Sequence, residues 1–259
     1  ESVTYKEGEE EEEVKYTYYE NGQLEKSVTY KDGKKDGLFE SYHENGQLNY
    51  KTTYKDSVIV DGLFKGYHEN GQLRWKGTVK DGKNDGLSEQ YHKNGQLEFK
   101  ETYRDGVIED GLFKGYHENG QLSSKTTYKD GKKDGLFESY HKNGQLMYKE
   151  TYRDGKPVGL SEQYHKNGQL WYKVTHKDGK RVGPFESYYE NGQLSYKTTY
   201  KDGKRVGLSE SYHENGQLRA EGNYKNDEKE GLWKTYHENG QLKIKTNYKV
   251  GYKKGVYEE

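Results

Sequence analysis

Short runs of apolar and aromatic residues alternate along the chain with polar stretches that contain glycine. In residues 37–56 the run Gly-Leu-Phe-Glu-Ser-Tyr-His is followed by Glu-Asn-Gly and then by Gln-Leu-Asn-Tyr-Lys-Thr-Thr-Tyr. Two such runs on either side of an Asn-Gly pair are typical of a β-hairpin. Apolar residues do not follow the 3.6-residue period of a helix over any long stretch. The pattern therefore predicts an all-β fold made of hairpins.

This hairpin pattern repeats along the chain. The tetrapeptide Asn-Gly-Gln-Leu occurs ten times, and the copies begin at Asn21, Asn45, Asn70, Asn94, Asn119, Asn143, Asn167, Asn191, Asn215 and Asn239. A fixed period of this kind, here about 24 residues, is the signature of a repeat array. We therefore expect about ten tandem β-hairpins in one elongated, twisted antiparallel sheet. Residues 1–259 are expected to be a single continuous array that starts and ends within a repeat, with sheet edges able to self-associate.

The Asn-Gly turn determines which side chains share a face of the sheet. A two-residue loop would pair Glu44 with Gln47, whereas a three-residue loop over 44–46 would pair His43 with Gln47. We favour the three-residue loop, because it gathers the recurrent apolar residues on one face. These residues are Leu38, Tyr42, Leu48, Tyr50 and Tyr54.

The same register has consequences for the charges and the second loop. Glu40 and Lys51 are expected to point to opposite faces. The Lys-Asp-Gly loops that join neighbouring hairpins are expected to be longer than the Asn-Gly turns and to keep Tyr30 and Leu38 on a common face. Two of these loops, residues 56–61 and 105–110, carry one extra residue and several aliphatic side chains. They are either simple insertions or contact points for a partner.

The opposite, mostly polar face is expected to carry a stripe of aromatic residues. Regularly spaced aromatics on a polar face can stack on sugar rings or dock a protein chain, although they can also pack on the neighbouring repeat. The candidate binding face consists of Phe39, Phe64, Phe113, Phe137, Phe185 and Trp233.

Composition and charge exclude several classes of function. Only 28% of the residues are hydrophobic and 34% are charged, which alone would indicate disorder, but aromatic residues reach 14% and are periodic. A repeat array that packs mainly on its neighbours explains both facts. The formal net charge of -1 argues against nucleic acid and membrane lipid as partners. The chain has no cysteine, which is compatible with export from a bacterial cell.

The residues that could carry chemistry are all reiterated. Histidine follows the first-strand tyrosine in eight repeats, but one histidine every ~9–10 Å along a sheet does not converge on a metal ion. The chain has no nucleophile elbow, phosphate-binding loop or dinucleotide fingerprint. We therefore expect no catalytic residues, no metal site and no cofactor, and a structural role for the histidines beside the turns.

The repeat unit resembles the MORN repeat, in particular the bacterial MORN-variant repeat. The hallmarks are Tyr-x-x-Asn-Gly-Gln-Leu and the Asp-Gly-Lys that follows, and the resemblance covers nearly the whole chain. It implies stacked β-hairpins that serve interaction or scaffolding, and some bacterial relatives are antitoxin-like or exported. The chain departs from the standard Tyr-x-Gly-x-Trp pattern in its few tryptophans, which places lipid binding last among the functions that the resemblance implies.

We expect a non-catalytic protein-interaction scaffold or adhesin, bacterial and exported or at the cell surface, with a protein partner that contacts several repeats. One alternative is a carbohydrate or cell-wall binding module with a glycan ligand. The other is a cytoplasmic, antitoxin-like neutralising protein, which is implied by the resemblance alone.

Overall fold

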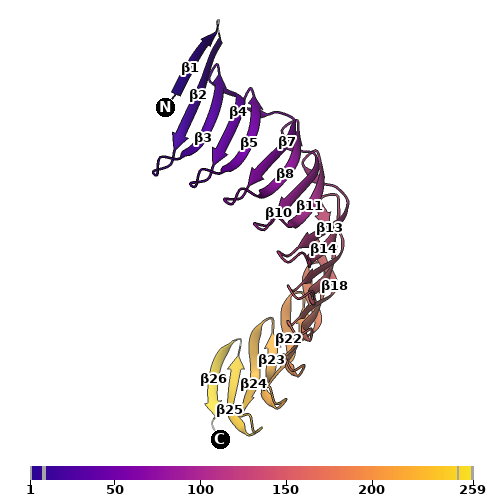
Figure 1. Cartoon of the computed structure of the whole chain (residues 1–259). Coiled ribbons are helices and arrows are strands. Elements are labelled where there is room, and N and C mark those ends of the chain that lie inside the picture. The colour runs from indigo at the N-terminus through magenta and orange to yellow at the C-terminus, as the bar shows by residue number, and fades with distance from the viewer. Residues whose placement is uncertain (1, 8–9, 250, 258–259) are drawn as a thin grey trace. The chain divides into compact units, whose positions relative to one another are not determined.

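The computed structural model describes residues 2–7, 10–249 and 251–257, and these form antiparallel strands without any helix (Figure 1). They divide into two compact units, of residues 1–122 with 128–131 and of residues 123–127 with 132–259. Within each unit, consecutive strands pair as tandem hairpins. The predicted all-β fold of tandem hairpin repeats is confirmed.

Unit 1 contains β1 (Ser2–Glu7), β2 (Glu10–Tyr18), β3 (Leu24–Lys31), β4 (Lys34–Tyr42), β5 (Leu48–Lys55), β6 (Val58–Ile59), β7 (Gly62–Tyr67), β8 (Leu73–Lys80), β9 (Lys83–Asn84), β10 (Gly86–Tyr91), β11 (Leu97–Arg104), β12 (Val107–Ile108) and β13 (Gly111–Tyr116). Strand β14 (Leu122–Lys129) contributes residues to both units. Unit 2 continues with β15 (Lys132–Lys133), β16 (Gly135–Tyr140), β17 (Leu146–Arg153), β18 (Lys156–Tyr164), β19 (Leu170–Lys177), β20 (Lys180–Tyr188), β21 (Leu194–Lys201), β22 (Lys204–Tyr212), β23 (Leu218–Lys225), β24 (Glu228–Tyr236), β25 (Leu242–Lys249) and β26 (Tyr252–Tyr257).

The Asn-Gly turn is a three-residue loop, as the sequence predicts. The His43 amide donates to the Gln47 carbonyl at 2.8 Å, and the Gly46 amide donates to the His43 carbonyl at 2.8 Å. Gly46 has φ 79°, in the left-handed region that this bulge requires and that glycine adopts at little cost.

A second bulge follows at once and makes the predicted side-chain layout wrong. Tyr42 pairs with Leu48, but Ser41 pairs with Tyr50, so Asn49 is an extra residue on the second strand. The shift moves Tyr50 and every later residue of β5 to the other side. Leu38, Tyr42 and Leu48 share one face, whereas Tyr50 and Tyr54 join Phe39 on the opposite face.

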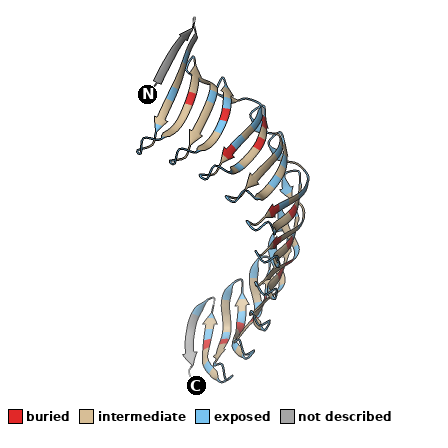
Figure 2. Cartoon of the chain, viewed as in Figure 1, coloured by how far each residue is buried: buried red, intermediate tan, exposed pale blue. Residues whose placement is uncertain are grey.

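The two faces of the sheet are therefore distinct. The aromatic face carries Phe39, Tyr50, Tyr54 and their counterparts in other repeats. The leucine face carries Leu38, Glu40, Tyr42, Lys51 and their counterparts. On the aromatic face the ring of Phe39 lies 5.9 Å from those of both Tyr50 and Tyr54, and Val28 and Val174 are buried. Figure 2 shows the buried residues as short bands within the strands. The core is a single layer of side chains on one face.

The Asp-Gly loops are short, which contradicts the expectation of longer loops. Asp32 and Gly33 have φ 49° and 75°, and Lys31 pairs directly with Lys34. Positive φ at both central residues is the two-residue hairpin turn that Asp-Gly favours. Because Tyr30 pairs with Lys35 and a register shift precedes Phe39, Tyr30 lies on the aromatic face, away from Leu38.

Neighbouring repeats are joined through the Asn-Gly turns. The side-chain amide of Asn45 donates to the backbone carbonyl of Glu69 in the next turn at 2.7 Å. Its Oδ1 accepts from the backbone amide of Gln47 at 3.0 Å. The imidazole Nε2 of His43 lies 2.9 Å from the Tyr67 carbonyl, one repeat further on. These contacts give the Asn and His of the motif the structural role beside the turn that the sequence predicts.

Candidate functional site

The leucine face exposes one large apolar side chain in almost every repeat. In unit 1 these are Leu38, Leu63, Leu87 and Leu112, and in unit 2 Leu136, Leu160, Leu208 and Leu232. Leu63 and Leu112 are the most open of them, with 60% and 59% of their surface exposed. Each leucine lies on the first strand of a hairpin, directly after a glycine, and its cross-strand partner is a short polar residue such as Thr53 or Thr78. Such a partner is too small to cover it. This row of exposed leucines is a candidate interaction surface.

The two segments with one extra residue, 56–61 and 105–110, add apolar groups beside the most exposed leucines. Val58, Val60 and Val107 are exposed. A hollow of about 310 Å³ is bordered by Thr53, Val60 and Leu63. A second hollow of about 310 Å³ is bordered by Leu87, Ile108 and Leu112. Both hollows lie in unit 1. The residues of segments 56–61 and 105–110 therefore shape the leucine face, which favours their interpretation as contact points.

Ion pairs lie on the leucine face among these leucines. Lys51 Nζ is 2.8 Å from Glu40, and the Tyr42 hydroxyl donates to Glu40 at 3.0 Å. The hydrogen bond from Lys51 lowers the pKa of Glu40, opposed by partial burial. The expectation that Glu40 and Lys51 point to opposite faces is wrong, because the bulge at Asn49 moves Lys51 to the face of Glu40. Since the lysine is exposed, such a pair contributes little to stability.

The predicted aromatic binding face is packed among tyrosines. Phe39, Phe64, Phe113, Phe137 and Phe185 are half-buried, and Trp233 is buried. The Phe185 ring, for example, lies about 6.0 Å from those of Tyr196 and Tyr200. The expectation that these residues stand on a polar face apart from the tyrosine layer is wrong, because the bulge at Asn49 moves the second-strand tyrosines to the same face. Their binding of a ligand stays a prediction.

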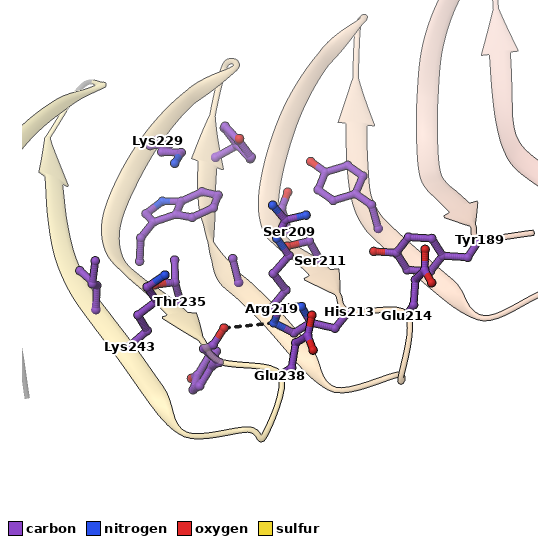
Figure 3. A pocket seen from close by; sticks show the side chains of 16 residues that line it. Tyr189, Ser209, Ser211, His213, Glu214, Arg219, Lys229, Thr235, Glu238 and Lys243 are labelled. Carbon is purple, nitrogen blue, oxygen red and sulfur yellow. Dashed lines mark hydrogen bonds between the residues drawn. The ribbon is translucent and has the colours of Figure 1, made fainter. Parts of the chain in front are cut away.

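One stretch of the aromatic face in unit 2 is hollowed around Ala220 (Figure 3). The hollow measures about 930 Å³, and Tyr196, Tyr224, Trp233 and Ile244 contribute its apolar lining. Figure 3 shows Ser209 and Ser211 along one side, with Arg219, His213 and Glu238 toward the turns. The Trp233 ring packs so closely on Gly222 that a Cβ there would collide with the indole. We call this space the Ala220 hollow.

A second feature of this face is the open ring of Trp171. It is 44% exposed and lies 5.8 Å from the His165 ring and 5.7 Å from the Tyr172 ring. A hollow of about 450 Å³ separates it from Tyr189 and Ser195. Trp171 occupies the bulged position that corresponds to Asn49, a position that sequence reasoning did not distinguish from its neighbours.

A buried polar cluster interrupts the aromatic face of unit 2. Ser161 Oγ donates to Glu150 at 2.5 Å and lies 2.9 Å from His176 Nδ1, which is itself 3.2 Å from Glu150. Ser161 and Glu150 both lie at Nδ1 of His176. In a catalytic Ser-His-acid triad, the serine and the acid contact different nitrogens of the ring. Burial lowers the pKa of His176, an effect that the Glu150 charge opposes. The arrangement is a structural substitute for the tyrosine that other repeats hold at this position.

Metal sites and membrane-spanning helices are two further features that bear on function. The described part of the chain contains no group of three or more His, Cys, Asp and Glu side chains arranged to hold a metal ion. Within the same residues, no helix has the length and apolar character to cross a membrane.

Comparison with solved structures finds matches of low similarity. The crystal structure of TcdB2-TccC3 matches at 13% identity with a TM-score of 0.19, over 92% of this chain and 15% of that one. The Photorhabdus luminescens Tc holotoxin pore with mutation TccC3-D651A matches at 14% identity and a TM-score of 0.19, over 93% and 13%. This chain thus spans 15% and 13% of the length of those two chains. Among curated proteins nothing matches.

Comparison with protein families identifies the repeat itself. The model described as "MORN repeat variant" matches ten segments, at residues 14–32, 35–56, 60–81, 84–105, 109–130, 133–154, 157–178, 181–202, 205–226 and 229–249. These segments coincide with the hairpins and recur with the same period. The chain belongs to the MORN repeat variant family, whose repeats form interaction modules.

Proposed function

We propose that this protein is a non-catalytic scaffold that binds a protein partner through its leucine face. The observation that carries the proposal is the row of exposed leucines, which is widened in unit 1 by Val60 and Ile108 at the two hollows. A protein partner with apolar side chains at its surface would gain by burying them there, at roughly 25 cal/mol per Å² of apolar area. Several similar contacts along the repeats would add through avidity.

The proposal is tested by replacing the exposed leucine at each of the two hollows with a polar residue. Leu63→Ser and Leu112→Ser in one chain are expected to weaken binding of a partner, captured from extracts of the source organism and then purified, by at least about tenfold. Trp171→Ser is the matched control, since it also replaces an exposed apolar side chain but on the aromatic face. Binding that is unchanged in the double variant and lost in the control would contradict the proposal.

Carbohydrate binding is the second candidate function, and the open ring of Trp171 is the observation that favours it. An exposed indole beside Ser195, Tyr189 and the carboxylates of Glu190 and Glu214 combines a flat apolar surface with polar groups. A glycan array with the intact chain and with Trp171→Ala tests it. Hits that disappear in the variant would support a cell-wall binding module, and an array without hits would remove it.

Location is a separate part of the proposal. We place the protein outside a bacterial cell or at its surface, in keeping with an adhesin. Fractionation of the source cells with an antibody against the chain tests this placement. Detection in the cytoplasm alone would favour an antitoxin-like neutralising role instead.

A further inference from the structure

One row of side chains crosses the strands on the aromatic face of unit 2. Large and small residues alternate along it, because Tyr172 pairs with Ser187, Ser187 with Tyr196, and Tyr196 with Ser211. The large member comes from the second strand of each hairpin and the small member from the first. In unit 1 the large positions are filled in the same way by Tyr50, Trp75 and Phe99.

In unit 2 the order breaks at Ser124, which pairs with Ser139, and again at Ala220. Ala220 pairs with Ser211 on one side and Thr235 on the other, and Thr235 pairs with Ile244. Three small residues therefore stand in succession between Tyr196 and Ile244. The Ala220 hollow, of about 930 Å³, lies over this stretch (Figure 3). Its size is sufficient for a side chain together with part of the backbone that presents it.

The polar lining of the hollow includes two cations that stand apart from the ion pairs of the sheet. Lysines elsewhere in unit 2 pair with glutamate, such as Lys173 with Glu186 at 2.7 Å and Lys234 with Glu221 at 3.0 Å. Within the described residues, neither Arg219 nor Lys243 has an ion pair or a hydrogen bond of its side chain. Both nevertheless border the hollow.

Elsewhere in unit 2, cations of this kind lie over the faces of aromatic rings. Lys229 Nζ lies 4.3 Å from the centre of the Trp233 ring, and the Arg205 guanidinium lies 4.0 Å from the centre of the Tyr224 ring. Both of these rings line the hollow as well. A cation over an aromatic face contributes roughly 0.5–2 kcal/mol. At Ala220, Arg219 and Lys243 border the hollow, but Ala220 itself supplies no aromatic ring for them to lie over.

We propose that the Ala220 hollow binds an aromatic side chain of a partner polypeptide, which takes the position of the ring that this repeat lacks. Tyr196 and Ile244 would flank the incoming ring, and Arg219 or Lys243 would lie over it. The buried Thr235 hydroxyl, which has no hydrogen-bond partner in the described part of the chain, lies at the same site. This inference rests on the proposed protein-binding function and adds a contact on the other face.

The test uses N-acetyl-tyrosinamide as the probe, with the intact chain and NMR detection of its tryptophan indole N–H signals. Titration is expected to shift the Trp233 signal. Ala220→Tyr is expected to weaken binding of the probe by at least about tenfold, because the new ring fills the hollow. For the same reason it is expected to raise the melting temperature of the protein. The raised melting temperature shows that the variant is folded. Ala220→Ser keeps the gap open and is expected to bind the probe within about twofold of the original affinity.

Two outcomes would overturn the inference. One is equal binding of the probe by Ala220→Tyr and by the unchanged chain. The other is equal or tighter binding of N-acetyl-leucinamide or methyl glucoside, which would make the hollow unselective or a sugar site. Leu63→Ser with Leu112→Ser is expected to leave probe binding unchanged. Failure of this inference and failure of the leucine-face proposal are thereby distinguishable.

Discussion

His176 shows how a single replacement alters the aromatic face. Other repeats hold tyrosine at this position, such as Tyr152 and Tyr200. There an uncharged ring packs against a phenylalanine. In His176, burial lowers the pKa below its ordinary value of 6.5. The unfolded chain therefore binds a proton more readily than the folded one. The stability that depends on neutral His176 is present above pH 6.5 and is lost as the pH falls through the lowered pKa.

We predict that His176→Tyr reduces this acid sensitivity. Urea midpoints measured from pH 8 down to about pH 5 should fall less steeply in the variant than in the unchanged chain. His92→Tyr is a suitable control, since Tyr19 and Tyr189 already occupy the corresponding turn position. An unchanged slope in His176→Tyr would show that another group governs the acid range.

At the scale of the hairpin, two contacts between successive hairpins of unit 2 show side chains matched in size. Trp233 covers Gly222, whereas Ser209 covers Thr198, with a hydrogen bond between their hydroxyls. A large side chain thus faces a small one, and two short side chains face each other. This complementarity fills a layer that is only one side chain deep.

We predict that Gly222→Thr destabilises the chain by roughly 1–3 kcal/mol, because the new side chain collides with the indole. Adding Trp233→Ser, which reproduces the Thr198–Ser209 pair, should restore part of the loss. Thermal or urea unfolding of both single variants and the double variant completes the cycle. Additive losses in the double variant would mean that the two positions do not touch.

The Asn-Gly hairpin, its three-residue loop and the repeat period could be predicted from the sequence, because Asn, Gly and their spacing encode them locally. The bulge at Asn49 could not, since Asn49 is replaced by Arg74, Glu98 or Trp171 in other repeats and no residue type marks it. That one residue decides whether Tyr50 joins Leu38 or Phe39. The two-residue Asp-Gly turns also follow from the sequence, because Asp-Gly favours positive φ at both central residues, and the expectation of a longer loop is wrong.

At the scale of the whole chain, most contacts lie within a hairpin or between successive hairpins. Asn45 bonds to Glu69 and His43 to Tyr67, one repeat away in each case. In such an array stability is approximately a sum over repeats and the contacts between neighbours. The exposed leucines recur with the same period, so a partner would meet equivalent groups in successive repeats.

We predict that excision of residues 181–204, one full period of the array within unit 2, leaves a folded β protein. The cut joins equivalent points of two repeats, so the contacts across the junction are of the same kind as before. Circular dichroism and the melting temperature measure the result. A chain that loses its β spectrum would contradict an array that is stabilised mainly by neighbouring repeats.

The separation of a leucine face from an aromatic face is tested most directly at two adjacent residues. The chain has no cysteine, so Leu136→Cys and Phe137→Cys each introduce a single thiol. Leu136 is exposed, whereas Phe137 packs with Tyr148 and Tyr152. Reaction with a charged maleimide should be fast at position 136 and much slower at position 137. Equal rates, or a faster reaction at position 137, would contradict this account of the fold and of the face proposed to bind.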